Sequence, residues 1–315
     1  MNITSSRNDI RSSAQDGHSS RHFQDKLIIF LFLLPSISIF LVFVIYPIIQ
    51  SIYYSLFNWK GLGPAVDFVA LDNYKRILTD RVFILALRNG IIIVVLSLVL
   101  QLPVSLLLAV MVGRDLPGRA FFRSIFFMPY VFSEVIVAIM WLLLFNPDPE
   151  RGFINALLVL IPGVRSHAWL GDPNTVLMCI FVVLTWKYFG FHMLLYLTGL
   201  QNIPSEVEEA ARIDGANRWQ LLTRITIPLL GSTIRTSVYL SVLGSLQQFI
   251  LVWIMTHGGP VNASEVMSTY MYRFGFVRFY FGYGSAVAIV MFLICLGFSL
   301  AYQRLAPQQD YLGGV

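Results

Sequence analysis

Residues 201–228 read QNIPSEVEEAARIDGANRWQLLTRITIP and lie between two long apolar stretches of the chain. Pro204 is expected to end the preceding helix, because proline disfavours a helical conformation in the residue before it. Ser205, with Glu208 three residues later, has the pattern of a capping box that starts a new helix. Gly215 suits the left-handed position that ends a helix. The segment therefore predicts a short, firmly bounded helix between two longer ones.

The rest of the segment predicts a second short helix and a contact surface. Asn217 can cap that second helix, and Pro228 can begin the apolar stretch that follows. The small side chains of Ala210 and Ala211, with Val207 beside them, allow another surface to approach closely. We interpret the resulting helix–turn–helix as a docking element.

The composition of the whole chain indicates a membrane protein. Of its 315 residues 57% are hydrophobic and only 12% are charged, and the mean hydropathy is +0.70. A soluble domain is about a quarter charged. The net charge of +5 fits the anionic inner leaflet of a membrane. No run of Lys and Arg alternates with aromatic residues as in a nucleic-acid site, so no nucleic-acid partner is expected.

Six apolar stretches are long enough to cross a bilayer as helices. They cover about Leu27–Phe57, Asn89–Val112, Phe121–Phe145, Thr175–Leu200, Thr233–Thr256 and Tyr283–Leu305. We expect a disordered cytoplasmic tail over residues 1–25, a transmembrane domain over 26–306 with its core at about 84–305, and a C-terminal tail over 307–315.

The distribution of positive charge predicts the orientation. An even number of spans places both termini on one side, and that side carries twelve Lys and Arg residues against nine on the other. The short Arg114–Arg123 loop contributes three of the twelve. By the positive-inside rule, both termini and the helix–turn–helix are cytoplasmic.

The spacing within the helix–turn–helix resembles the EAA loop of the permease subunits of ABC importers. The matching residues are Glu209-Ala210-Ala211, then Gly215 after three residues, and after nine more Ile225-x-Ile227-Pro228, where the family usually has Leu in place of Ile227. The resemblance implies an all-α integral membrane fold of six transmembrane helices, with a cytoplasmic coupling helix between spans four and five. It assigns ATPase coupling to Glu209, Ala210, Ala211, Asp214 and Gly215.

Further motifs resemble the carbohydrate-uptake permeases, in particular the maltose-F-like and glycerol-phosphate-A-like subunits. They include Met128-Pro129-Tyr130, Gly199-Leu200-Gln201, His257-Gly258-Gly259-Pro260 and Tyr283-Gly284-Ser285-Ala286. The implied function is import of a sugar or related polyol-type solute across the bacterial inner membrane. The implied partners are a second, non-identical permease, two ATPase subunits and an extracytoplasmic solute-binding protein.

The chain itself is not expected to be an enzyme. None of its four lysines lies in a Gly-x4-Gly-Lys-Ser/Thr sequence, so ATP and Mg²⁺ are expected on the ATPase subunits, with no cofactor or metal bound here. An ion-driven secondary transporter and a membrane-embedded enzyme are the alternatives. Glu134 is the single carboxylate expected within the spans, and the five His residues are scattered, so neither alternative is favoured.

Polar and aromatic residues within two spans are candidates for the substrate pathway. Ser241, Gly244, Ser245 and Gln248 follow i, i+3, i+4, i+7 spacing and would share one helix face. In the fourth span, Phe189, Gly190 and Met193 form a comparable strip, and the resemblance places both strips at the sugar-contacting positions. Helix–helix packing is the competing interpretation. For the ionisable Lys187, His192 and Glu134 we favour structural roles, with Lys187 paired to Glu134 or to a backbone carbonyl near a kink.

Overall fold

The computed structural model describes residues 26, 28–113 and 118–305 of the chain. The predicted tails over 1–25 and 307–315, and part of the Arg114–Arg123 loop, lie outside the described residues. Within these ranges the fold is helical, and one isolated bridge between Phe57 and Phe68 is the sole extended pairing.

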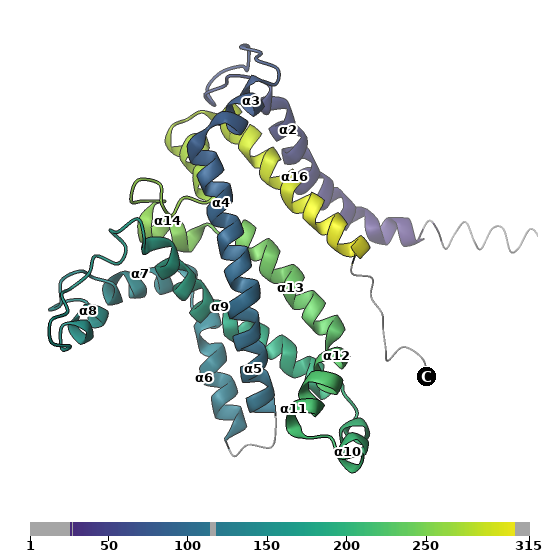
Figure 1. Cartoon of the computed structure of the whole chain (residues 1–315). Helices are drawn as coiled ribbons and strands as arrows, with labels where there is room; N and C mark the ends of the chain where they lie inside the picture. Colours follow the sequence, from purple (N-terminus) through teal and green to yellow (C-terminus); the bar gives the residue numbers. More distant parts are fainter. Residues whose placement is uncertain (1–25, 27, 114–117, 306–315) are drawn as a thin grey trace, which may run out of the picture.

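Five helices are long and apolar enough to cross a membrane (Figure 1). They are Ile28–Ser55, which ends in α2 (Tyr46–Ser55); Arg81–Gly113, made of α4 (Arg81–Leu96) and α5 (Leu102–Gly113); α9 (Val176–Gln201); Gly231–Thr256, made of α13 (Gly231–Leu246) and α14 (Ile250–Thr256); and α16 (Phe281–Leu305). The shorter helices are α3 (Asp72–Thr79), α8 (Phe153–Leu158), α10 (Ser205–Ile213), α11 (Arg218–Leu221), α12 (Ile227–Leu229) and α15 (Met267–Tyr272).

The predicted third span over Phe121–Phe145 is wrong as a single helix. It consists of α6 (Arg119–Val131) and α7 (Glu134–Leu144), which meet at 96°. Phe132 has an extended backbone, and the Ser133 side chain caps α7 by accepting a hydrogen bond from the Val135 amide at 3.3 Å. Six spans result if this bent pair counts as one.

The predicted fifth span is interrupted as well. α13 ends at Leu246 and α14 begins at Ile250, so Gln247, Gln248 and Phe249 form a short non-helical break. The break brings polar side chains and backbone into the middle of an apolar segment. Such interruptions are tolerated at membrane depth only where the backbone is buried in protein or lines a water-filled cavity.

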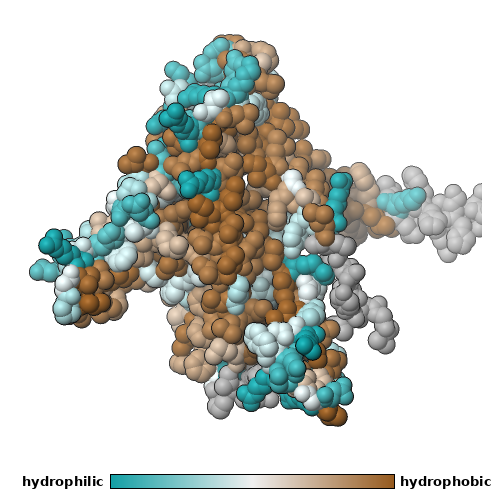
Figure 2. Space-filling model, in the orientation of Figure 1, coloured by the Kyte–Doolittle hydropathy of each residue, from teal (hydrophilic) through white to brown (hydrophobic). Residues whose placement is uncertain are grey.

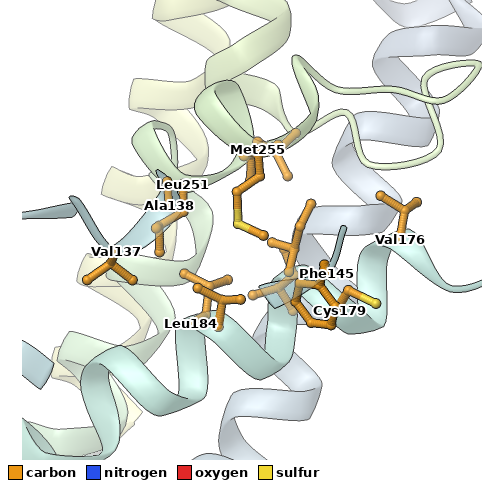
Figure 3. Close-up of a cluster of buried hydrophobic side chains, with 13 residues drawn as sticks. Val137, Ala138, Phe145, Val176, Cys179, Leu184, Leu251 and Met255 are labelled. Carbon is orange, nitrogen blue, oxygen red and sulfur yellow. The ribbon is translucent and has the colours of Figure 1, made fainter. Parts of the chain in front are cut away.

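Two large clusters of buried apolar side chains hold the bundle together. The first joins α4, α7, α9 and α14, with Ile93, Val137 and Leu251 among its members (Figure 3). The second joins α3, α4, α13, α15 and α16, with Phe83 and Tyr270 at its centre. α14 therefore belongs to the first cluster and α13 to the second.

The outer surface is arranged as expected for a protein in lipid. Apolar side chains cover the length of the bundle, and hydrophilic ones gather toward its two ends (Figure 2). In the helix Ile28–Ser55 none of the most apolar window is buried, and its second half packs along α16. Lipid is the solvent that such a surface requires.

Glycines allow one very close helix crossing. A Cβ at Gly284 of α16 would lie 2.6 Å from the Cα of Gly275, which follows α15. The two backbones touch there, so any larger side chain would separate them.

The loop after α14 contains the Gly258-Gly259-Pro260 motif and is fixed by a buried ion pair. Glu265 is fully buried, and its Oε2 lies 2.6 Å from Nη2 of Arg273. The Asn89 side chain of α4 donates to the carbonyls of Ala263 and Glu265, each at 2.9 Å. Burial raises the pKa of Glu265, against the opposing effects of the Thr269 hydroxyl and Arg273.

Candidate functional site

The hairpin α10–α11 follows the predicted segment closely but begins differently. Pro204 occupies the N-cap position, so Ser205 lies inside the first turn and makes no capping hydrogen bond. The predicted capping box of Ser205 and Glu208 is therefore wrong. Glu208 instead lies 3.3 Å from Arg212 in an i, i+4 ion pair on the helix surface.

The end of α10 is fixed by its glycine. Gly215 has a φ of +85°. Its amide donates to the Arg212 carbonyl at 3.1 Å, and the Ala216 amide donates to the Ala211 carbonyl at 2.9 Å. These two bonds form a Schellman motif, which requires the left-handed conformation that glycine adopts without strain. The predicted helix stop at Gly215 is confirmed.

The second helix is capped as predicted. Asn217 Oδ1 accepts from the Gln220 amide, and Gln220 Oε1 accepts from the Asn217 amide, both at 2.9 Å. With both helices capped, the turn between them is held by the backbone and by these two side chains. The hairpin is thus a defined element of structure at the end of the bundle (Figure 1).

The hairpin presents side chains away from the bundle. Of the predicted coupling residues, Ala211 is buried at its base, while Glu209, Ala210, Asp214 and Gly215 are exposed. Ile213 and Trp219 are 85% and 71% exposed. A cavity of about 840 Å³ lies behind the hairpin, where Arg212 and Arg218 approach the ends of α5 and α9. Large exposed apolar side chains beside charged ones are typical of protein-binding surfaces.

A second cavity, of about 230 Å³, lies within the bundle and is called the central pocket here. Its lining comes from α4–α5, α6, α9 and α13, and consists of Ser97, Gln101, Tyr130, Leu184, Tyr188, Phe191, His192, Leu240, Ser241, Gly244, Ser245 and Gln248. All four residues of the predicted strip in the fifth span are among them. The break after α13 turns the Gln248 side chain toward the same space as the helical residues before it.

The strip predicted in the fourth span does not line this pocket. A Cβ at Gly190 would lie 2.0 Å from the Phe126 carbonyl oxygen, so Gly190 lets α9 contact the backbone of α6. Met193 is fully buried in a cluster with Ala109 and Tyr196. Phe189 meets the Phe126 ring edge to face.

A neighbouring face of α9, and not the predicted strip, lines the central pocket. Leu184, Tyr188 and Phe191 lie on this face at i, i+4, i+7 spacing, and His192 adjoins them. The prediction took Phe189, Gly190 and Met193 from the resemblance and favoured a structural role for His192, whereas this neighbouring face carries the side chains that line the pocket. Tyr188 and His192 were the signal that could have identified it.

The central pocket offers hydroxyl, amide and aromatic groups. Ser97 Oγ and Ser245 Oγ lie 3.3 Å apart, and His192 Nδ1 lies 2.8 Å from Ser237 Oγ. Gln248 Nε2 is buried and has no hydrogen-bond partner among the described residues. The described lining includes no Asp, Glu, Lys or Arg. Such a surface is suited to an uncharged solute rich in hydroxyl groups.

The chain belongs to the family of binding-protein-dependent transport system inner membrane components, whose sequence pattern matches residues 101–311. It is thus a membrane permease of the ABC-transporter class, of the kind that serves sugar uptake.

Relatives and solved structures agree with this assignment. The chain is 38% identical to the probable ABC transporter permease protein YurN of Bacillus subtilis, over 89% of this chain and 96% of that one. It is 32% identical to the trehalose/maltose transport system permease protein MalF of Thermococcus litoralis, over 87% and 92%. The fold matches a chain of a bacterial ABC transporter that imports the acidic polysaccharide alginate, with a TM-score of 0.81, 26% identity and coverage of 93% and 99%.

Proposed function

We propose that this chain imports an uncharged sugar or related polyol-type solute, driven by ATP hydrolysis on two separate ATPase subunits that bind ATP and Mg²⁺. The observation that carries the proposal is the hairpin α10–α11, which projects from one end of the bundle and whose turn is fixed by the Schellman motif at Gly215 and by the capping box of Asn217 and Gln220. In this proposal Glu209, Ala210, Ala211, Asp214 and Gly215 transmit ATPase closure to the spans. A rigid lever can transmit movement, whereas a flexible loop would absorb it.

The central pocket supports the choice of solute. Relatives of this chain are named for uptake of diacetylchitobiose and of trehalose and maltose. Others are named for sn-glycerol-3-phosphate and alginate, which are charged. Because the described lining carries no Asp, Glu, Lys or Arg to pair with a charged solute, burial of such a solute would be uncompensated. The pocket therefore favours a neutral carbohydrate.

The remaining partners follow from the same proposal. A second, non-identical permease completes the passage, and an extracytoplasmic solute-binding protein delivers the solute. A similar solved transporter is in complex with a periplasmic protein that carries an alginate pentasaccharide. Phe189, Gly190 and Met193 contribute by packing α9 against its neighbours, and Ser241, Gly244, Ser245 and Gln248 contribute to the pathway.

The test is uptake of labelled neutral oligosaccharides by proteoliposomes that contain the complete transporter and its binding protein. Gly215→Val forces a branched side chain into a φ of +85°, which distorts the end of α10. We expect solute-stimulated ATP hydrolysis and uptake to be lost together. Gly231→Ala is the matched control, because a Cβ there meets nothing and its φ is not positive.

Full ATP-dependent uptake by Gly215→Val would contradict the role of the hairpin. Uptake that needs an ion gradient and no ATP would contradict the importer as a whole and favour a secondary transporter. Binding of the charged solutes alone would contradict the neutral-solute assignment while leaving the coupling intact.

A further inference from the structure

The bend between α6 and α7 leaves backbone carbonyls without helical partners. The last carbonyls of a helix have no amide one turn ahead to bond with, and at membrane depth water does not replace that amide. Here the carbonyls concerned belong to Pro129, Tyr130 and Phe132. A hydrogen-bond donor from another part of the chain must therefore satisfy these carbonyls if the bend is to be stable.

Lys187 of α9 supplies that partner. Its side chain is almost wholly buried, 4% exposed. Its Nζ lies 3.3 Å from the Pro129 carbonyl and 2.9 Å from that of Tyr130, and it also donates to Phe132. An ammonium group has three N–H donors and no acceptor, which matches three carbonyls. A positive charge is also favourable at the negative end of the α6 dipole.

Tyr188, the residue after Lys187, contacts the α7 side of the bend. The Tyr188 hydroxyl donates to Oε1 of Glu134, the first residue of α7. Consecutive residues of one helix therefore contact the end of α6 and the start of α7. Gly190, one turn further along, keeps α9 against the α6 backbone, so that Lys187 can reach the carbonyls.

We propose that Lys187 and Tyr188 form a clamp that fixes the angle between α6 and α7 and thereby positions the aromatic wall of the central pocket. Tyr130, whose carbonyl is held by Lys187, stacks on Phe191 with ring centroids 4.9 Å apart. Both rings line the pocket, as does Tyr188 itself. Lys187 acts through Tyr130 and is a positioning residue. The inference rests on the proposed function in taking this pocket as the place where the solute is bound.

The first measurement is the bend itself, which does not depend on transport. Spin labels are placed by Phe121→Cys and Leu143→Cys, both at exposed positions on the two arms, after Cys179→Ala and Cys295→Ala. Pulsed electron–electron distances are recorded in the assembled transporter. Lys187→Met removes the donors at similar side-chain length, and we expect a longer, broader label distance as the arms open. Lys187→Arg keeps a cation and should restore most of the original distance.

The second measurement is uptake. If Tyr130 is displaced, Lys187→Met should raise KM for the neutral oligosaccharide on the order of tenfold, with a much smaller change in the maximal rate. Thr198→Val is the matched control on α9, because its hydroxyl donates to the Leu195 carbonyl of the same helix and does not line the central pocket. Tyr188→Phe keeps the ring and removes the contact to Glu134, and it serves as the test variant if Lys187→Met does not assemble.

An unchanged label distance in Lys187→Met, or in Tyr188→Phe where only that variant assembles, overturns the clamp. A changed distance with KM equal to that of Thr198→Val overturns its role in positioning the pocket wall. Failure of the wild-type transporter to take up any carbohydrate would refute the proposed function, while the label distances would still decide whether the clamp exists.

Discussion

Gln248 shows how a single residue links the break in the fifth span to the central pocket. Its backbone carbonyl accepts a hydrogen bond from Ser268, while its buried Nε2 has no partner among the described residues. An unpaired buried donor is costly, and a solute hydroxyl could accept from it. Gln247, the adjacent residue, is exposed and contacts Cys295 instead.

We predict that Gln248→Ala weakens solute uptake by raising KM about fivefold to tenfold, the equivalent of one hydrogen bond. Ser245→Leu should act in the same direction by filling the pocket. Gln247→Ala is the control and should leave uptake kinetics unchanged. Concentration-dependent uptake at matched expression measures all three, and identical kinetics in all of them would remove this face of α13 from the pathway.

At the scale of single residues, the sequence predicts the side of the central pocket that α13 contributes. Spacing alone places Ser241, Gly244 and Ser245 on a common face, because a helix repeats every 3.6 residues. For α9 the same rule allows several faces, and hydrophobicity does not choose among them in a helix that is apolar all round. Gly190 lies where α9 packs against the backbone of α6, so its missing side chain serves helix packing and not the pocket.

Among the elements, the bend between α6 and α7 was predicted in part: the pairing of Lys187 with a backbone carbonyl near a kink is confirmed, but local sequence did not place the kink between these two helices. Pro129 lies in α6, but Pro35 and Pro47 lie in the helix Ile28–Ser55, which remains helical along its length with a π-helical stretch over Leu41–Ile45. What distinguishes the bend is Lys187, which bonds to the Pro129 carbonyl from 58 residues further along the chain. By contrast, the hairpin α10–α11 was predictable because its stop and its second cap depend on near neighbours.

The crossing of α16 with the segment after α15 gives a prediction for an element. Gly284→Ala places a methyl group 2.6 Å from the Gly275 Cα, within the backbone, where nothing flexible can move aside. We expect a loss of stability of about 1–3 kcal/mol, as for overpacked cores, measured as a lower melting temperature of the purified transporter.

Gly297→Ala is the matched control on the same helix, because a Cβ there meets nothing within 4 Å. It should be neutral or slightly stabilising, since alanine favours a helix more than glycine does. Equal melting temperatures for the two variants would contradict this prediction, because they would show that the contact between Gly284 and Gly275 accommodates a methyl group.

For the whole molecule, the orientation across the membrane is the prediction to test. The hairpin lies at one end of the bundle and α3 at the other (Figure 1). With both native cysteines replaced, Asp148→Cys should react with a membrane-impermeant maleimide in spheroplasts, because the loop after α7 is predicted to face outward. Asp214→Cys on the hairpin should react only after permeabilisation. The reverse pattern would place the hairpin outside and exclude its contact with an ATPase.

The two buried clusters have a mechanical consequence. α13 is anchored in one and α14 in the other, and the three residues Gln247, Gln248 and Phe249 connect them. α4 runs through both clusters, with Ile93 in the first and Phe83 in the second, so this helix holds the clusters together while the connecting residues change their backbone angles. Since Gln248 lies in that connecting segment and lines the central pocket, a local change there alters the hydrogen-bonding groups that face the pocket without unpacking either cluster.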